Sequence, residues 1–155
     1  MTIEILGVEK NLKGTKIIVK HSAVLSYTPA YTFFLRGMAD LIDSKFHLEC
    51  TEWNDLNCGI LWAEDEFDNI LGCICYDRSY KDSIIPQIYS ILTVVDEKYR
   101  QTGIHKIMYG YFQQQVRNLK CSVIKSNVHH KNTIRLISAE KDGFVPLQYL
   151  MVKKI

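Results

Sequence analysis

The chain has 155 residues, of which 47% are hydrophobic, and a formal net charge of +2 at pH 7. This length and composition predict a single globular domain over residues 1–155 with enough chain for a packed core. Acidic and basic residues are interspersed, which gives no electrostatic footprint for a nucleic-acid partner. The apolar runs are too short to span a bilayer and the N-terminus lacks the layout of a signal peptide, so we expect no membrane partner and a cytoplasmic location.

The cysteines and histidines show no spacing typical of a disulfide framework or a metal site. Cys73 and Cys75 alternate with Ile74 in a strand pattern, which places both thiols on one face of a sheet. We interpret the cysteines as reduced, buried small hydrophobic residues. The adjacent His129 and His130 point apart on any regular element, so no metal is expected. The remaining cysteines are Cys50, Cys58 and Cys121.

The first part of the chain predicts a strand or hairpin followed by a helix. The strand-like segments 2–8 and 15–21 flank the turn-like EKNLKG. In YTPAYTFFLRGMADLIDSKF, Thr28 is a candidate helix cap and Pro29 suits the first helical turn. Apolar residues then follow at helical spacing, namely Phe34, Met38, Leu41 and Ile42.

The middle of the chain predicts three strands and a second helix. Two apolar segments, 59–64 and 70–77, are separated by DEFDN, which favours a hairpin. The loop RSYKDSIIP leads to a further strand over 87–95. After Gly103 the apolar residues recur at helical spacing, namely Ile104, Ile107, Met108, Tyr111, Phe112 and Val116.

The last part of the chain predicts a strand within 121–128, a short helix within 131–143 and a closing strand within 144–155. Asn132 lies near the start of this helix and Gly143 lies just past its end. Helices therefore separate runs of strands, which indicates an α+β (mixed α/β) fold rather than a doubly wound one.

The segment EKYRQTGIHKIM, between the strand 87–95 and the helix after it, holds one glycine among basic and polar residues. A glycine that opens a helix lets backbone N–H groups gather around an anion, and the helix dipole adds a partial positive charge. This pattern makes a phosphate group the first candidate ligand.

The wider segment VVDEKYRQTGIHKIM resembles the acyl-CoA motif of the GNAT N-acetyltransferase superfamily. In that motif a strand ends in Val, an acidic turn often reads V-D-P-x-Y, and R/Q-x-x-G-x-G/A opens a helix. Glu97 stands where proline is common, and His105 stands where the last small residue is expected. The residues that match in register are Val95, Asp96, Tyr99, Arg100 and Gly103.

A second stretch resembles the later GNAT motif N-x-x-A-x-x-x-Y-x-x-x-G-F. Asn132 lies twelve positions before Phe144, and Gly143 precedes that phenylalanine. The likeness covers roughly residues 60–155. It implies the GNAT acyl-CoA N-acyltransferase fold, in which helices flank a mostly antiparallel sheet that is splayed at the CoA site.

The resemblance implies acetyl-CoA as co-substrate, without a metal. The backbones of Thr93, Val94 and Val95 would pair with the pantetheine arm as an added strand does, although core strand residues are the simpler interpretation. Asn132 would contact the arm, a role compatible with a helix N-cap. Arg100 and Lys106 would add charge, or they are ordinary solvated cations. The expected pyrophosphate cradle consists of the backbone amides of Gln101, Thr102, Gly103, Ile104, His105 and Lys106.

The expected activity is acetyl transfer from acetyl-CoA to a primary amine by direct attack in a ternary complex. Many GNAT members protonate the departing thiolate with a tyrosine, and this chain has Ala139 there. That departure and His105 support the alternative, a non-catalytic CoA-binding or regulatory module.

The sequence alone assigns no catalytic residue. Tyr76, Asp77 and Tyr89 lie near the expected substrate side, but residues of these types are more often structural. The acceptor pocket would be built from the N-terminal helix, the loop 78–86 and the strand ends. A homodimer is left open, with an aromatic surface around Tyr31, Phe33 and Phe34 as its candidate interface.

Overall fold

The computed structural model describes residues 2–43, 55–128, 130–147, 151 and 153. None of the helices in these ranges is long and apolar enough to cross a membrane. The elements follow in the order β1 (Ile3–Lys10), β2 (Lys16–Ser22), α1 (Tyr31–Asp43), β3 (Cys58–Glu64), β4 (Ile70–Asp77), β5 (Gln87–Val95), the 3-10 turn η1 (Glu97–Tyr99), α2 (Ile104–Asn118), β6 (Val123–Ser126) and α3 (Thr133–Lys141).

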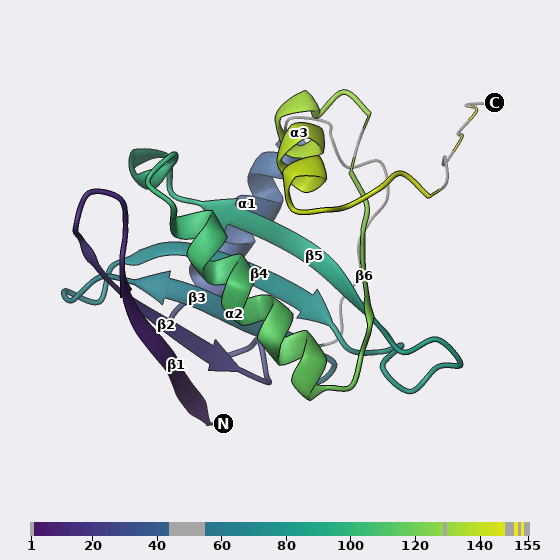
Figure 1. Cartoon of the computed structure of the whole chain (residues 1–155), viewed down its shortest axis with the longest axis horizontal. Helices are drawn as coiled ribbons and strands as arrows, with labels where there is room; N and C mark the ends of the chain where they lie inside the picture. Colours follow the sequence, from purple (N-terminus) through teal and green to yellow (C-terminus); the bar gives the residue numbers. More distant parts are fainter. Residues whose placement is uncertain (1, 44–54, 129, 148–150, 152, 154–155) are drawn as a thin grey trace.

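The strands form one six-stranded sheet in the order β1-β2-β3-β4-β5-β6 (Figure 1). Each neighbouring pair from β1 to β5 is antiparallel, whereas β5 and β6 are parallel. The parallel pair is possible because α2 carries the chain back from the end of β5 to the start of β6. This mostly antiparallel sheet with flanking helices confirms the predicted fold class.

The two long helices cover opposite faces of the sheet, and each closes its own core. Figure 1 shows α2 lying across one face and α1 behind the other. The face under α2 buries Ile104, Met108, Phe112 and Val116 against apolar residues of β2, β3, β4 and β5. The face under α1 buries Phe34, Met38, Ile60, Trp62, Cys73, Cys75 and Leu92.

A glycine lets α1 pack closely on the sheet. A Cβ at Gly37 would lie 2.8 Å from Cδ2 of Leu92 and 3.3 Å from Cγ1 of Val94, too close for an undisturbed contact. The helix-weakening Gly37 is therefore retained for close approach to β5.

The predicted state of the described cysteines is confirmed. Cys58, Cys73, Cys75 and Cys121 are buried and carry free thiols. Complete burial raises the pKa of the Cys73 thiol to about 12 because the thiolate loses its hydration. Cys50 and His129 lie outside the described residues.

The start of α1 differs from the predicted capping. The helix begins at Tyr31, and the Thr28 hydroxyl donates to the carbonyl of Leu25 at 3.0 Å instead of accepting a helix N–H. The backbone oxygen of Thr28 accepts from the Tyr31 N–H at 3.1 Å. Ile42 is exposed although it continues the apolar spacing, whereas its neighbour Leu41 packs against the core under α1. Residues 44–46 of the predicted helix lie outside the described residues.

The closing strand is not seen in the part of it that the structure describes. Residues 144–147 follow α3 without regular structure, and residues 148–150, 152, 154 and 155 lie outside the described ranges.

Candidate functional site

The loop between β5 and α2 has the shape of an anion cradle. Asp96 fixes its start, since its N–H donates to the carbonyl of Leu71 at 2.8 Å and its Oδ1 accepts from the N–H of Lys98 at 2.9 Å. Gln101 and Gly103 then take left-handed conformations, with φ of 62° and 89°. These two residues reverse the chain so that it enters α2 with its backbone amides at the loop.

The N-terminus of α2 offers unpaired donors. Gly103 is the N-cap and makes no side-chain capping bond, while its carbonyl accepts from the N–H of Ile107 at 3.1 Å. The N–H groups of the first helical turn have no partner within a helix, and the dipole places a partial positive charge beside them. The uncapped N-terminus of α2 is therefore compatible with the predicted cradle.

The turn between β1 and β2 supports this loop from behind. The N–H of Leu12 donates to the carbonyl of Thr102 at 2.9 Å, and the buried Thr102 hydroxyl donates to the carbonyl of Tyr99 at 2.6 Å. A Cβ on Gly103 would lie 3.3 Å from Cγ of Leu12. The positive φ of Gly103 is a conformation that side chains with a Cβ rarely adopt, which accounts for a glycine at this position.

The two candidate cations of the loop are both exposed. The guanidinium of Arg100 folds back, and its Nε donates to the carbonyl of Val95 at 3.2 Å. Lys106 projects from the first turn of α2 into solvent. Both side chains are positioned to add positive charge near the cradle without being part of the core.

The edge of β5 is open over its second half. β5 pairs with β6 from Gln87 to Ser90, and within the described residues Ile91 to Val95 have no partner strand on that side. A register shift against β4 also falls here, between Ser90 and Leu92, so that Ile91 has no partner in β4 either. The sequence did not reveal this irregularity.

The antiparallel ladder decides which β5 backbones face the open edge. The N–H of Asp96 donates toward β4, to the carbonyl of Leu71. In an antiparallel ladder the backbone N–H and C=O groups of successive residues point to alternate sides, so those of Val94 face β4 and those of Thr93 and Val95 face away from it. The bond from Arg100 to the carbonyl of Val95 agrees with this direction. Of the three predicted backbone contacts, Thr93 and Val95 therefore face the open edge, where the carbonyl of Val95 already accepts from Arg100, and Val94 faces β4.

The helix α3 is tied to the start of α2. The Nε2 of His105 lies 2.8 Å from Oδ2 of Asp142, and the imidazole stacks on Tyr109 at 5.9 Å between ring centroids. Arg135 extends the group, with its Nη1 3.8 Å from the same carboxylate oxygen. His105 thus faces its own helix and α3, so any contact it makes with an anion in the cradle would come from its backbone N–H.

Asn132 has the predicted position at the start of α3. Its Oδ1 accepts from the N–H of Arg135 at 3.2 Å, which is an N-cap.

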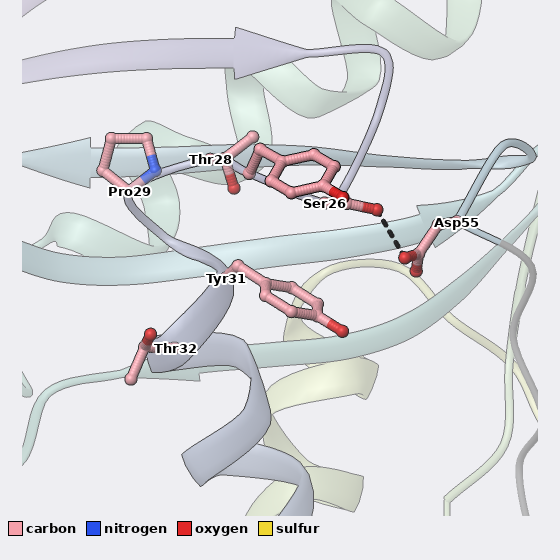
Figure 2. Close-up of a pocket in the computed structure, with 7 residues that line it drawn as sticks. Ser26, Thr28, Pro29, Tyr31, Thr32 and Asp55 are labelled. Carbon is pink, nitrogen blue, oxygen red and sulfur yellow. Dashed lines mark hydrogen bonds between the residues drawn. The ribbon is translucent and has the colours of Figure 1, made fainter.

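A cavity of about 520 Å³ lies at the N-terminal end of α1 (Figure 2). The Ser26 hydroxyl donates to Oδ2 of Asp55, which joins the loop before α1 to the residues before β3. The loop 78–86, expected to contribute to an acceptor pocket, does not line this cavity. Its lining residues are Ser26, Tyr27, Thr28, Pro29, Tyr31, Thr32 and Asp55.

Several solved structures with a similar backbone arrangement are acetyltransferases. An aminoglycoside acetyltransferase from an uncultured soil metagenomic sample, in complex with sisomicin, has a TM-score of 0.67 at 15% identity, over 90% of this chain and 95% of that one. The ribosomal-protein-alanine N-acetyltransferase of Brucella melitensis biovar Abortus 2308 has a TM-score of 0.63 at 11% identity, over 90% and 99%. The aminoglycoside N-acetyltransferase AAC(6')-Iy in complex with CoA has a TM-score of 0.62 at 15% identity, over 88% and 98%.

The chain has the GNAT acetyltransferase fold. The similarity lies in structure, because no protein-family model and no curated protein sequence matches the chain. The resemblance read from the two motifs is thereby confirmed at the level of the fold.

Within this GNAT fold, two of the residues considered for catalysis have structural partners. Tyr76 is buried under α2, where its hydroxyl lies 2.7 Å from Nε2 of His21. Burial raises the pKa of Tyr76 and lowers that of His21, so both are neutral at pH 7. Oδ1 of Asp77 accepts from the N–H and the hydroxyl of Ser79 and so shapes the loop after β4.

The position at which many GNAT members have a tyrosine is buried in this chain. Ala139 is 6% exposed within α3, and its carbonyl accepts from the N–H of Phe144 at 3.0 Å.

The candidate dimer surface loses one of its predicted residues, because Phe34 is fully buried in the α1 core and cannot form part of an interface. In the described ranges, no group of three or more His, Cys, Asp or Glu side chains could hold a metal ion.

Proposed function

We propose that residues 1–155 form a single N-acetyltransferase domain. It would transfer the acetyl group of acetyl-CoA to a primary amine of a small molecule, peptide or protein. The observation that carries this proposal is the open edge of β5, which runs directly into the left-handed loop and the uncapped N-terminus of α2. A strand edge and an anion cradle in sequence match the two parts of CoA, a pantetheine arm and a pyrophosphate.

The chain's own groups account for binding and orientation. The amides of residues 101–106 hold the pyrophosphate, and the outward backbone groups of Thr93 together with the N–H of Val95 hydrogen-bond the arm. This places the thioester near Ile91, whose unpaired backbone is suited to donate its N–H to the carbonyl oxygen. Such a donor stabilises the negative charge that develops on that oxygen during attack.

The reaction is a direct transfer. The neutral amine attacks the thioester carbon, the C–N bond forms, and the C–S bond breaks as the amine loses a proton and CoA leaves as a thiol after gaining one. The described cysteines do not suit a covalent route, because they are buried in the core. Positioning two reactants in one cleft supplies much of the rate enhancement.

Thiol release from acetyl-CoA tests this function across an amine panel. The structural neighbours suggest sisomicin and a peptide with an N-terminal alanine as first members of the panel. We expect thiol release that depends on an amine and matches the amount of acetylated product. Release without acetylated amine would contradict the proposal.

The second candidate function is a non-catalytic CoA-binding or regulatory module. The buried Ala139 favours it, since the position where many GNAT members have a tyrosine offers no group to protonate the thiolate. Calorimetry with CoA separates the two functions when combined with the panel. Tight CoA binding without turnover on any amine would support the module.

A further inference from the structure

The irregularity in β5 is visible in its side chains as well as in its pairing. Ser90 and Leu92 pair with consecutive residues of β4, so Ile91 is an extra residue in β5. Side chains of successive strand residues normally point to opposite faces of the sheet. Here Leu92 is buried in the core under α1, and Ile91 packs against the same core. This is a β-bulge, in which one residue is left unpaired and the strand bends locally.

A glycine of α1 lies against the strand at this bulge. The helix packs on β4 and β5, and a Cβ added to Gly37 would lie 2.8 Å from Cδ2 of Leu92. The next nearest side chain is that of Val94, with its Cγ1 at 3.3 Å. Because the core is close-packed, an added methyl group there must displace one of these neighbours. The missing side chain of Gly37 therefore decides how closely α1 holds the residue that follows Ile91.

Backbone conformation gives no reason for a glycine at this position. Among the described residues the glycines with positive φ are Gly14, Gly103 and Gly143, so Gly37 has the ordinary backbone of a helix. Inside a helix, glycine is less favourable than alanine because it loses more conformational freedom on folding. This disadvantage falls where α1 meets the bulge, so the close contact is the feature that the glycine provides.

We propose that Gly37 is a positioning residue for acetyl transfer. By letting α1 pack closely on Leu92, it fixes the bulge and with it the direction of the Ile91 N–H. The inference rests on the proposed function, in which this N–H binds the thioester oxygen. A donor to a developing oxyanion acts only at hydrogen-bond distance, so a displacement of the bulge by a few tenths of an ångström slows the transfer. The pyrophosphate loop is held by its own contacts with β4 and with the turn between β1 and β2, and it keeps its shape.

Gly37→Ala is the direct test, because alanine is the better helix former and would raise Tm at a position with room for it. We expect no rise in Tm, a kcat about tenfold lower than that of the wild type, and a KM for acetyl-CoA raised by no more than about threefold. A kcat within about twofold of the wild type would overturn the proposal, since a merely structural glycine affects stability alone.

Gly110→Ala is the matched control. Gly110 lies inside α2 with no atom within 4 Å of an added Cβ, so we expect a higher Tm and an unchanged kcat. Leu92→Val provides the rescue, because it removes the Cδ2 atom that the new methyl group meets. In the double variant Gly37→Ala/Leu92→Val, we expect kcat to rise above that of Gly37→Ala alone. Losses that simply add would show that the two positions act independently and would contradict the proposal.

Binding separates this inference from the function on which it rests. Acetyl-CoA and CoA differ in the acetyl carbonyl that the Ile91 N–H is proposed to bind. Calorimetry with both ligands should show that Gly37→Ala weakens the binding of acetyl-CoA about threefold relative to that of CoA. This loss in a chain that acetylates no amine would uphold the positioning role and contradict the proposed transfer. An unchanged ratio of the two affinities would refute the positioning role even in a chain that acetylates an amine.

Discussion

Replacing Gly103 with valine tests the CoA assignment at its most sensitive point. The residue has a φ of 89°, where a β-branched side chain is strained, and its Cβ would lie 3.3 Å from Cγ of Leu12. Backbone strain of this kind costs about 1–3 kcal/mol. The chain can relieve it by turning residue 103 to negative φ, which redirects the amides that open α2.

The loss in CoA affinity follows from those amides. A hydrogen bond to a charged group contributes about 1.5–3 kcal/mol, so losing two weakens binding by about 3–6 kcal/mol. This corresponds to an increase in Kd of roughly 10²–10⁴-fold. Calorimetry with CoA measures it directly, and thermal denaturation should show a fall in Tm of only several degrees.

Gly14→Val is the matched control. Gly14 has a φ of 79° and no atom within 4 Å of an added Cβ, so it carries similar backbone strain outside the cradle. We expect a comparable loss of stability with CoA affinity preserved. If Gly103→Val binds CoA within about twofold of the wild type, the loop does not hold the pyrophosphate.

Three further substitutions examine the surroundings of the site. Ala139→Tyr should lower the free energy of unfolding by about 1–3 kcal/mol without raising turnover, because the position is buried; faster thiol release from a stable variant would contradict this. The lowered pKa of His21 means that the unfolded chain binds more protons below pH about 6.5, so stability should fall as pH decreases through that value. Urea denaturation at several pH values should show a flatter dependence in His21→Gln. His105→Ala removes the contact with Asp142 and should cost about 0.2–1 kcal/mol of stability, with the pH dependence of CoA affinity unchanged in calorimetry. A flattened pH dependence would show that the imidazole acts on the phosphates.

The loop between β5 and α2 and the strand before it could be predicted from the sequence because their signals are local. The run from Gln87 to Val95 is β5 with the predicted bounds, and Gly103 and Asn132 open helices as expected. Turn chemistry and helical spacing act within a few residues, so a single sequence carries them.

The remaining parts of the site depend on contacts between distant segments. Asp55 meets Ser26 only because the sheet brings the start of β3 beside the end of β2. The unpaired Ile91 arises from a register shift between two strands, and neither strand shows it alone. Thr28 likewise has capping chemistry, but the path of the chain gives its hydroxyl to Leu25.

The contact of Leu12 with Thr102 also bears on how the molecule assembles. These residues lie far apart in the sequence, so the contact closes a long loop, and such contacts form slowly because of their entropic cost. We therefore expect the loop between β5 and α2 to reach its final shape late in folding, once the N-terminal hairpin has docked. If CoA binds this loop as proposed, we expect it to stabilise contacts that form after the folding transition state and therefore mainly to slow unfolding.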